Sequence, residues 1–228
     1  DRLASDFQFP TGVVMPVGRR QELLKWAVEA PDRYIIEDDY DSEFRYRGKP
    51  IPALQGMDRS GRVIYLGTFS KCIAPAIRVS YLVLPTHLLL RYRSQTSFYA
   101  STVSRIDQNI LYQFLAGGYF ERHLNRMRAV YKTKHDLLLE QIEPLRERFE
   151  IRGEHAGIHI LLTSRQGESE EQLIQKAEEA GVKVYGLSSY FIHPQHNHRP
   201  ATVVLGYASL SEEQIVEGIR LLMECWGA

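Results

Sequence analysis

Between residues 12 and 84, short apolar runs alternate with turn signals and with a single segment of helical spacing. Each run is only a few residues long and apolar throughout, as expected for a strand that is buried on both faces of a sheet. A helix between the first two strands is typical of the parallel or mixed sheet of an α/β layer. We therefore expect a helix over residues 19–29 and strands over 13–15, 34–36, 63–66 and 79–84.

The rest of the chain changes pattern twice. Between residues 88 and 149, apolar residues recur at helical spacing, with few Gly or Pro to interrupt them. From residue 150 onward, strand patterns alternate with helical patterns, which predicts a smaller α+β lobe. The expected helices are 87–95, 104–115, 119–142, 170–180 and 212–226, and the expected strands are 157–163, 182–185 and 202–208.

These patterns predict an α/β protein of three parts. Residues 1–120 form part of a large lobe, residues 121–144 form a linking helix, and residues 145–228 form a small C-terminal α+β lobe. A ligand site is expected in the crevice between the lobes.

Composition excludes several classes of function. The 28 basic residues balance 28 acidic ones, so no net charge attracts the chain to nucleic acid or to an anionic membrane. Basic residues on the linking helix alternate with acidic ones, which favours a solvated face over a nucleic-acid stripe. Cys72 and Cys225 are too far apart in sequence for a Cys-x2-Cys metal site, and two cysteines make no disulfide scaffold. Without a signal peptide or a long apolar run, we expect a cytoplasmic protein, and without an initiator Met, a piece of a longer one.

A lysine follows the third expected strand in the sequence GTFSK at 67–71. Lys71 has apolar neighbours and an arginine nearby, Arg78, and this setting favours a depressed pKa and hence a nucleophilic amine that can form a Schiff base. Thr68, Ser70 and Arg78 would offer a phosphate two neutral donors and a bidentate cation. An amine beside a phosphate cradle indicates pyridoxal phosphate. Taken alone the motif is weak, because most such lysines are surface charges.

A second set of polar residues follows the strand at 34–36. Asp38 and Tyr40 are two positions apart, so in an extended chain both would point to the same side. A carboxylate at the nitrogen of a pyridine ring keeps that ring protonated, and a phenol can bond the ring oxygen. The alternatives are an exposed acidic loop or a divalent-cation site, because five acidic residues crowd into 37–43.

The combination resembles the second half of a fold-type I pyridoxal-phosphate protein of the aspartate aminotransferase superfamily. In that superfamily a segment similar to QFPTG at 8–12 passes under the cofactor ring. More narrowly, IIEDDYDSEF at 35–44, GTFSK at 67–71 and GYA at 206–208 are similar to the GabR/MocR regulators. In these regulators a GntR-type winged helix-turn-helix is fused to an aminotransferase-like domain. The resemblance covers residues 7–226.

The resemblance implies a role for each residue of the motifs. Lys71 would form the internal aldimine, Asp38 would face the ring nitrogen, and Tyr40 would face the ring hydroxyl. Thr68, Ser70 and Arg78 would hold the phosphate. It also implies a fold-type I architecture, here a C-terminal portion of the domain, and a homodimer that binds DNA only through a winged helix-turn-helix absent from this chain.

The sequence also departs from the family pattern. The earlier half of the domain, with its phosphate turn and its stacking aromatic residue, is absent, and residues 1–6 do not resemble the strand that precedes QFPTG in the family. Where the γ-aminobutyrate-responsive member has an arginine for the effector carboxylate, this sequence has Ser188, Ser189 and Tyr190. We therefore expect a different small amino acid as effector, read by Ser189 and Tyr190, with Arg199 as its carboxylate partner or else as a surface arginine.

The remaining candidates are weaker. His193, His196 and His198 could hold zinc, but no thiol or carboxylate lies near them in sequence, which favours a polar lid and no metal site. Cys72 is expected to pack rather than to react.

Two functions use the same residues. A regulator needs only the exchange of Lys71 for an effector amine, whereas an aminotransferase also needs Lys71 as a base for the α-proton. The motif wording favours the regulator. A sugar-binding or nucleotide-binding module is disfavoured because no Gly-rich phosphate loop is present.

Overall fold

The computed structural model describes residues 2–4, 15–40, 42–44, 52–154, 157–191 and 200–227. These residues divide into two units. The first unit takes in the described residues from 2 to 43 and from 52 to 127, and the second takes in Phe44 and those from 128 to 227. Among the described residues, no helix is both long and apolar enough to cross a membrane.

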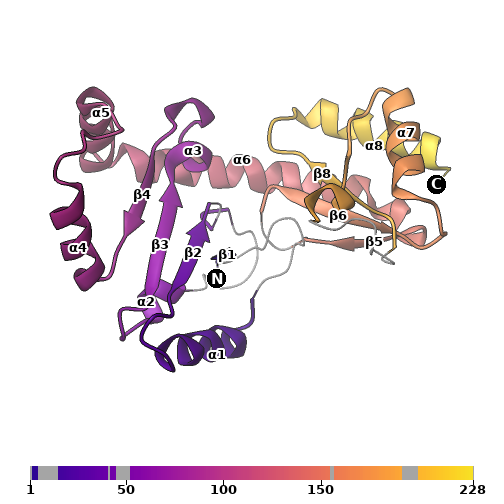
Figure 1. Cartoon of the computed structure of the whole chain (residues 1–228). Helices are drawn as coiled ribbons and strands as arrows, with labels where there is room; N and C mark the ends of the chain where they lie inside the picture. The colour runs from indigo at the N-terminus through magenta and orange to yellow at the C-terminus, as the bar shows by residue number, and fades with distance from the viewer. Residues whose placement is uncertain are drawn as a thin grey trace. The chain divides into compact units, whose positions relative to one another are not determined.

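A four-stranded sheet is the centre of the first unit (Figure 1). Its strands pair in the order β1, β2, β3, β4, with the first three parallel and the last antiparallel to β3. This is the mixed sheet of an α/β layer that the apolar runs predict. The strand bounds are β1 Arg2–Ala4, β2 Ile35–Asp39, β3 Val63–Thr68 and β4 Ser80–Val83.

The helices of the first unit begin with α1 and end with the first part of α6. A small core of Ala27, Ile35, Leu54 and Val63 joins α1 and α2 to the sheet. The bounds are α1 Val17–Val28, α2 Leu54–Met57, α3 Phe69–Cys72, the 3-10 helix η1 Pro75–Ile77, α4 Thr86–Thr96, α5 Arg105–Ala116 and α6 Tyr119–Gln141.

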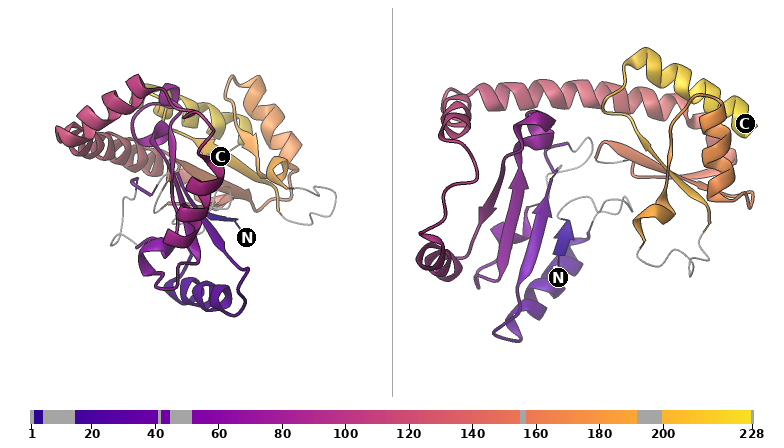
Figure 2. Two further views of the ribbon diagram at one scale, coloured as in Figure 1. Left: turned by 60° about the vertical axis from the view of Figure 1, so that its left-hand side comes forward. Right: turned by 45° about the horizontal axis from the view of Figure 1, so that its top comes forward.

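The second unit is built on an antiparallel sheet of order β5, β6, β8, β7. Helices α7 and α8 contact each other beside this sheet (Figure 2). The bounds are η2 Glu143–Glu147, β5 Phe149–Arg152, β6 His159–Ser164, α7 Glu170–Glu179, β7 Tyr185–Gly186, η3 Leu187–Tyr190, β8 Thr202–Gly206 and α8 Glu212–Trp226.

Helices α7 and α8 of the second unit each begin at a capping box. Ser169 caps α7 with Gln172, and Ser211 caps α8 with Gln214. In each pair the serine hydroxyl and the glutamine side chain bond each other's backbone N–H groups, which satisfies donors that the first helical turn leaves without partners. Trp226 at the end of α8 is buried, and its Nε1 donates to the carbonyl of Leu173 at 3.0 Å. The two helices are therefore fixed to each other by packing and by a hydrogen bond.

Some sequence expectations are wrong. Residues 2–4 do form a strand, although their sequence does not resemble the expected one, because parallel pairing to β2 can be set by the partner strand. Met15 lies outside any strand, and residues 13 and 14 lie outside the described residues. The short helix α2 and the strand β5 have no clear sequence signal, and β7 begins three residues later than expected, at Tyr185.

Candidate cofactor site

The polar motifs of the first unit lie at one edge of its sheet. Strands β2 and β3 are parallel, and Asp38 is the register partner of Leu66. The carboxyl ends of parallel strands meet at the same edge, which is where α/β proteins bind ligands. The short helix α3 follows β3 directly at this edge and carries Ser70 and Lys71 (Figure 1). Asp38 and Lys71 therefore come from the same edge of the sheet.

The turn before Lys71 is tied to the turn that carries Arg78. The Thr68 hydroxyl caps α3 by accepting from the Ser70 backbone N–H at 3.2 Å. The same hydroxyl donates to the Val79 carbonyl at 3.3 Å, and the Phe69 backbone N–H donates to that carbonyl at 3.0 Å. These bonds hold the residue before Ser70 next to the residue after Arg78, so the predicted phosphate donors are brought to one place.

Three polar side chains at this edge of the sheet have no internal hydrogen-bond partner among the described residues. Within the described part of the chain, the side chains of Ser70, Lys71 and Arg78 form no hydrogen bond or ion pair. Lys71 and Arg78 are exposed, and Ser70 is half-buried. A hydroxyl, an ammonium and a guanidinium without internal partners form a donor set suited to an anionic group.

Arg78 adopts an uncommon backbone conformation. Its φ is 48° and its ψ is 36°, in the left-handed region, and it is the only non-glycine residue with a positive φ among those described. For a residue with a Cβ this conformation costs roughly 1–2 kcal/mol. Such backbone strain is commonly found at ligand sites, where it places a side chain in a position that an unstrained backbone would not give.

Asp39 lies between the two predicted cofactor residues, and its contacts escaped the sequence reasoning. Its Oδ2 accepts from the Tyr65 hydroxyl at 2.6 Å and from the Ser42 hydroxyl at 2.7 Å. Burial, and then the bond to Asp39, raises the pKa of Tyr65 above its ordinary value. Adjacent residues of a strand point to opposite faces of the sheet. The bonds of Asp39 to Tyr65 and Ser42 therefore fix the strand on one face, while the Asp38 side chain points to the other face. Asp38 and Tyr40 are both half-buried.

Glu37 is a second internal carboxylate in the acidic run. It is fully buried and accepts from the backbone N–H groups of Leu54 at 2.7 Å and Gln55 at 2.9 Å, at the start of α2. Burial, the largest cause, raises its pKa. The carboxylates of Glu37 and Asp39 thus accept hydrogen bonds from protein donors. In an exposed acidic loop or in a cation site, these carboxylates would instead face solvent or a metal ion. Among the residues described, no group of His, Cys, Asp or Glu has the arrangement of a metal site.

Tyr81 on β4 packs across the base of this edge. Its ring centroid lies 5.3 Å from that of Phe69, and a Cβ placed on Gly67 would come within 2.3 Å of its ring. A side chain at 67 would therefore force the Tyr81 ring to move. Cys72 beside Lys71 is buried, and burial, followed by the charge of Glu43, raises its thiol pKa to about 12. Cys72 therefore remains a protonated packing residue.

The predicted effector residues lie in the second unit. Ser189 and Tyr190 belong to η3 and are exposed, and the Ser189 hydroxyl donates to the Gly186 carbonyl at 2.8 Å. Arg199 lies outside the described residues. So do QFPTG at 8–12 and the histidines at 193, 196 and 198.

Comparison with known families explains this arrangement. The model of the family described as aminotransferase class I and II matches residues 8–222. The chain belongs to this family. The kynurenine aminotransferase of Pyrococcus horikoshii, solved with PMP and kynurenine, superposes with a TM-score of 0.85 at 30% identity, over 98% of this chain and 55% of that one.

The curated relatives include transcriptional regulators. YdeL of Bacillus subtilis, described as an uncharacterized HTH-type transcriptional regulator, is 46% identical over 96% of this chain and 47% of its own length. MocR of Rhizobium meliloti, described as a probable rhizopine catabolism regulatory protein, is 36% identical over 94% of this chain and 43% of its own length. The chain therefore spans about half the length of these relatives.

Pyridoxal 5′-phosphate is the cofactor of this family, and the donor set fits it. The phosphate of such a cofactor needs neutral donors and a cation. Ser70 and Arg78, whose side chains have no partner among the described residues, lie at one edge of the sheet and would suit it, whereas the Thr68 hydroxyl already donates to the Val79 carbonyl. The Lys71 amine, which has no partner among the described residues, is available for the carbonyl carbon. The family match thus confirms the sequence prediction of the fold class and of the cofactor.

Proposed function

We propose that this chain is the effector-binding part of a pyridoxal-phosphate-dependent transcriptional regulator of the MocR type. The observation that carries the proposal is its similarity to HTH-type regulators at up to 46% identity, over nearly the whole chain. In the complete protein, DNA binding belongs to a separate winged helix-turn-helix module. We also propose that the complete protein is a cytoplasmic homodimer.

Each residue of the site has a role in this proposal. Lys71 would hold the cofactor through its amine, and an effector amine would compete with Lys71 for the same carbonyl carbon. Asp38 holds the proton on the ring nitrogen, and Tyr40 bonds the ring hydroxyl. The phosphate is bound by Thr68, Ser70 and Arg78. Bound pyridoxal phosphate supplies an aldehyde that condenses reversibly with primary amines, which is the chemistry that a sensor of amino compounds requires.

The effector in this proposal is a small amino acid. Ser189 and Tyr190 offer hydroxyl groups from η3, and Arg199 is proposed as the partner of the effector carboxylate. If Arg199 has this role, Arg199→Ala should weaken the binding of every amino acid by roughly tenfold to a hundredfold, because a charge-assisted bond contributes about 1.5–3 kcal/mol. An affinity within twofold of the wild type for the whole panel would remove Arg199 from the site.

The second candidate function is catalysis as an aminotransferase. It is favoured by the likeness to a kynurenine aminotransferase and by the Lys71 amine, which can also act as the base that moves the α-proton. The two functions differ in turnover. A sensor exchanges amines and stops, whereas an aminotransferase releases a keto acid repeatedly.

The deciding experiment uses the full-length protein loaded with pyridoxal phosphate. A panel of small amino acids is added while the cofactor absorbance and keto-acid release are followed. We expect a spectral change without multiple turnovers, loss of the cofactor linkage in Lys71→Ala, and an unchanged linkage in Lys25→Ala, which alters another exposed lysine of the same unit. Repeated keto-acid release would assign the enzyme instead. A Lys71→Ala protein that still forms a borohydride-reducible linkage would overturn the site itself.

A further inference from the structure

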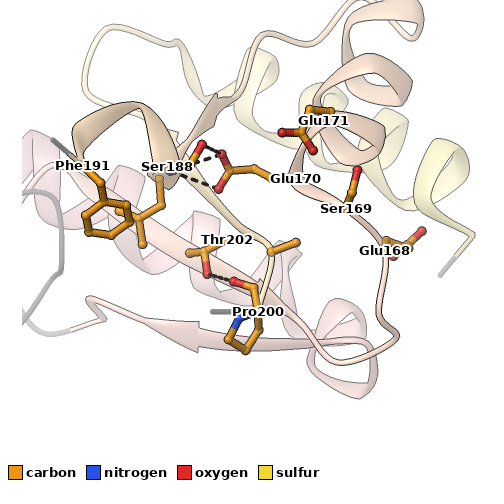
Figure 3. A pocket seen from close by; sticks show the side chains of 10 residues that line it. Glu168, Ser169, Glu170, Glu171, Ser188, Phe191, Pro200 and Thr202 are labelled. Atoms are coloured by element: carbon orange, nitrogen blue, oxygen red, sulfur yellow. Dashed lines mark hydrogen bonds between the residues drawn. The ribbon is translucent and has the colours of Figure 1, made fainter. Parts of the chain in front are cut away.

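The effector turn η3 is held from one side by a glutamate of the second unit. Glu170 is the first residue of α7. The Ser188 backbone N–H donates to both oxygens of the Glu170 carboxylate, Oε1 and Oε2, each at 3.2 Å. The Ser188 hydroxyl donates to Oε1 in a short bond (Figure 3). Ser188 therefore has both of its donors on one carboxylate, and it immediately precedes Ser189 and Tyr190.

The chain makes room for this contact at Gly186. A Cβ at this position would lie 2.1 Å from the Glu170 Oε1 and 2.6 Å from its Cδ. Its φ is −76°, which any residue can adopt, so the glycine is needed for space and not for backbone freedom. The absent side chain at Gly186 lets the carboxylate reach the turn.

A cavity of about 260 Å³ lies beside this contact. One wall is the start of α7 with Glu168 and Glu170, another is Leu187 and Ser188, and a third is Pro200 and Thr202. The residues just before position 192 and the residues just after position 199 therefore both lie against the start of α7. The turn and the following strand therefore share a common anchor point.

The acidic residues here do not indicate a cation site. Glu168 forms ion pairs with Arg148 at 3.3 Å and with Lys176 at 3.2 Å. Glu170 is already bonded to Ser188. Because Glu168 is paired with two cations and Glu170 accepts two donors from Ser188, both carboxylates already have protein partners.

We propose that Glu170 is a positioning residue for effector selection, which fixes Ser188 and thereby the orientation of Ser189 and Tyr190. The inference rests on the proposed function, because it assigns these two residues the reading of the effector. A charge-assisted bond to a backbone N–H is stronger than a neutral one, so it can hold a short, exposed 3-10 turn that has little packing of its own. Glu170 itself need not touch the effector.

The test replaces Glu170 with Gln in the full-length, cofactor-loaded protein. The carboxamide keeps the size but removes the charge and leaves one acceptor oxygen for the two donors of Ser188. We expect faster hydrogen exchange of the amides at 187–191, cofactor affinity within twofold of the wild type, and about tenfold weaker binding of the preferred amino acid with a flatter ranking across the panel. Glu178→Gln is the matched control, since it removes the same charge from an exposed position on the same helix.

A double-mutant cycle separates positioning from general stability. If Glu170 acts through Ser188, Glu170→Gln and Ser188→Ala together should be no worse than the stronger single variant in both exchange and affinity. Additive effects would overturn the inference. Gly186→Ala should mimic Glu170→Gln by forcing the carboxylate away, and it serves if the glutamine variant folds poorly.

The outcomes distinguish this inference from the proposed function. If hydrogen exchange of the amides at 187–191 is unchanged in Glu170→Gln, Glu170 does not fix η3, and the inference is refuted whatever happens to effector binding. Faster exchange with wild-type affinity and ranking shows that η3 is fastened but does not select the effector, which also refutes the inference. If no amino acid changes the wild-type spectrum, the proposed function fails and the selective role of Glu170 fails with it.

Discussion

The two units bury their apolar residues to very different degrees. Among the described residues, the second unit has a continuous core of 17 buried side chains, from Leu138 to Trp226, whereas the core cluster of the first unit contains four. Most of the exposed large hydrophobic side chains that the structure describes belong to the first unit, and Phe98 and Ile106 are 75% and 73% exposed. The second unit therefore covers its own apolar surface, and the first does not.

The difference shows which interactions hold each unit in its fold. In the second unit, a sheet with buried strands packs against capped helices, and hydrophobic burial is the dominant stabilising contribution. In the first unit, internal polar contacts of Glu37 and Asp39 set the geometry at the sheet edge. The exposed apolar surface of the first unit is of the kind that another part of a protein commonly covers, and the homodimer that we propose would do so.

The largest expected effect is on the core of the second unit. Leu162 on β6 is fully buried, so Leu162→Ala should reduce the free energy of unfolding by about 3 kcal/mol through lost burial and a cavity. Urea unfolding followed by Trp226 fluorescence, in a Trp26→Phe background, measures this unit. Val216→Ala on α8 is the control, because that side chain is 40% exposed and its loss should change stability by less than about 0.5 kcal/mol. A cost below about 1 kcal/mol for Leu162→Ala would contradict the contrast between the units.

The next effect is on the polar network of the first unit. Tyr65→Phe removes the bond to Asp39 and should lower stability by about 1.5 kcal/mol, as expected for a bond to a charged group. Cofactor affinity should also fall, because the Asp38 and Tyr40 backbone loses its support. Tyr34→Phe makes the same change at an exposed bond to His87 and should have a smaller effect on both quantities. Equal effects of the two variants would indicate that the network has no special role.

A smaller effect is expected in the pH dependence of stability. The pKa of Glu37 is raised above the ordinary value of 4.5, so the folded state holds this proton more tightly than the unfolded state does. Its contribution to stability is present in full below pH 4.5 and is lost as the pH rises through the folded pKa, with a slope of at most about 1.4 kcal/mol per pH unit. Glu37→Gln should lack this loss, so the wild-type advantage should shrink as the pH rises. Parallel stability curves for the two proteins would refute this assignment.

The smallest effect on stability is expected at Arg78. Arg78→Gly should relieve the left-handed strain and, after the added freedom of the unfolded chain, leave a gain of about 0.5 kcal/mol. Its cofactor affinity should nevertheless fall about tenfold or more, since the phosphate loses its guanidinium. Arg78→Ala is the matched variant, with the same loss of affinity but no gain in stability. Thermal unfolding and cofactor titration measure the two quantities separately, and wild-type affinity in both variants would exclude Arg78 from the phosphate site.

The longer helices and the cofactor motif could be predicted from the sequence because their signals are local, whereas the four-residue helices α2 and α3 were not expected. The expected helix at 119–142 corresponds to α6, and Thr68 caps α3 just before Lys71, as a short hydroxyl at a strand end would suggest. Strand β1 could not be predicted, because its pairing depends on β2 and not on its own residues. Nor could the partners of Asp39 and Glu170, which lie 26 and 18 residues away along the chain. The pairing of Asp39 with Ser42, three residues on, was the one local hint of that network.

The close approach of Tyr81 to Gly67 has a consequence for how such sequences can diverge. A side chain at position 67 would occupy the space of the Tyr81 ring, so position 67 cannot gain a side chain unless residue 81 moves or becomes smaller. Homologues with a larger residue at 67 should carry a smaller one at 81, and the two columns of a family alignment should vary together. Because residue 67 immediately precedes Thr68 and helix α3, this pair would also limit which lineages can remodel this edge of the sheet by single substitutions.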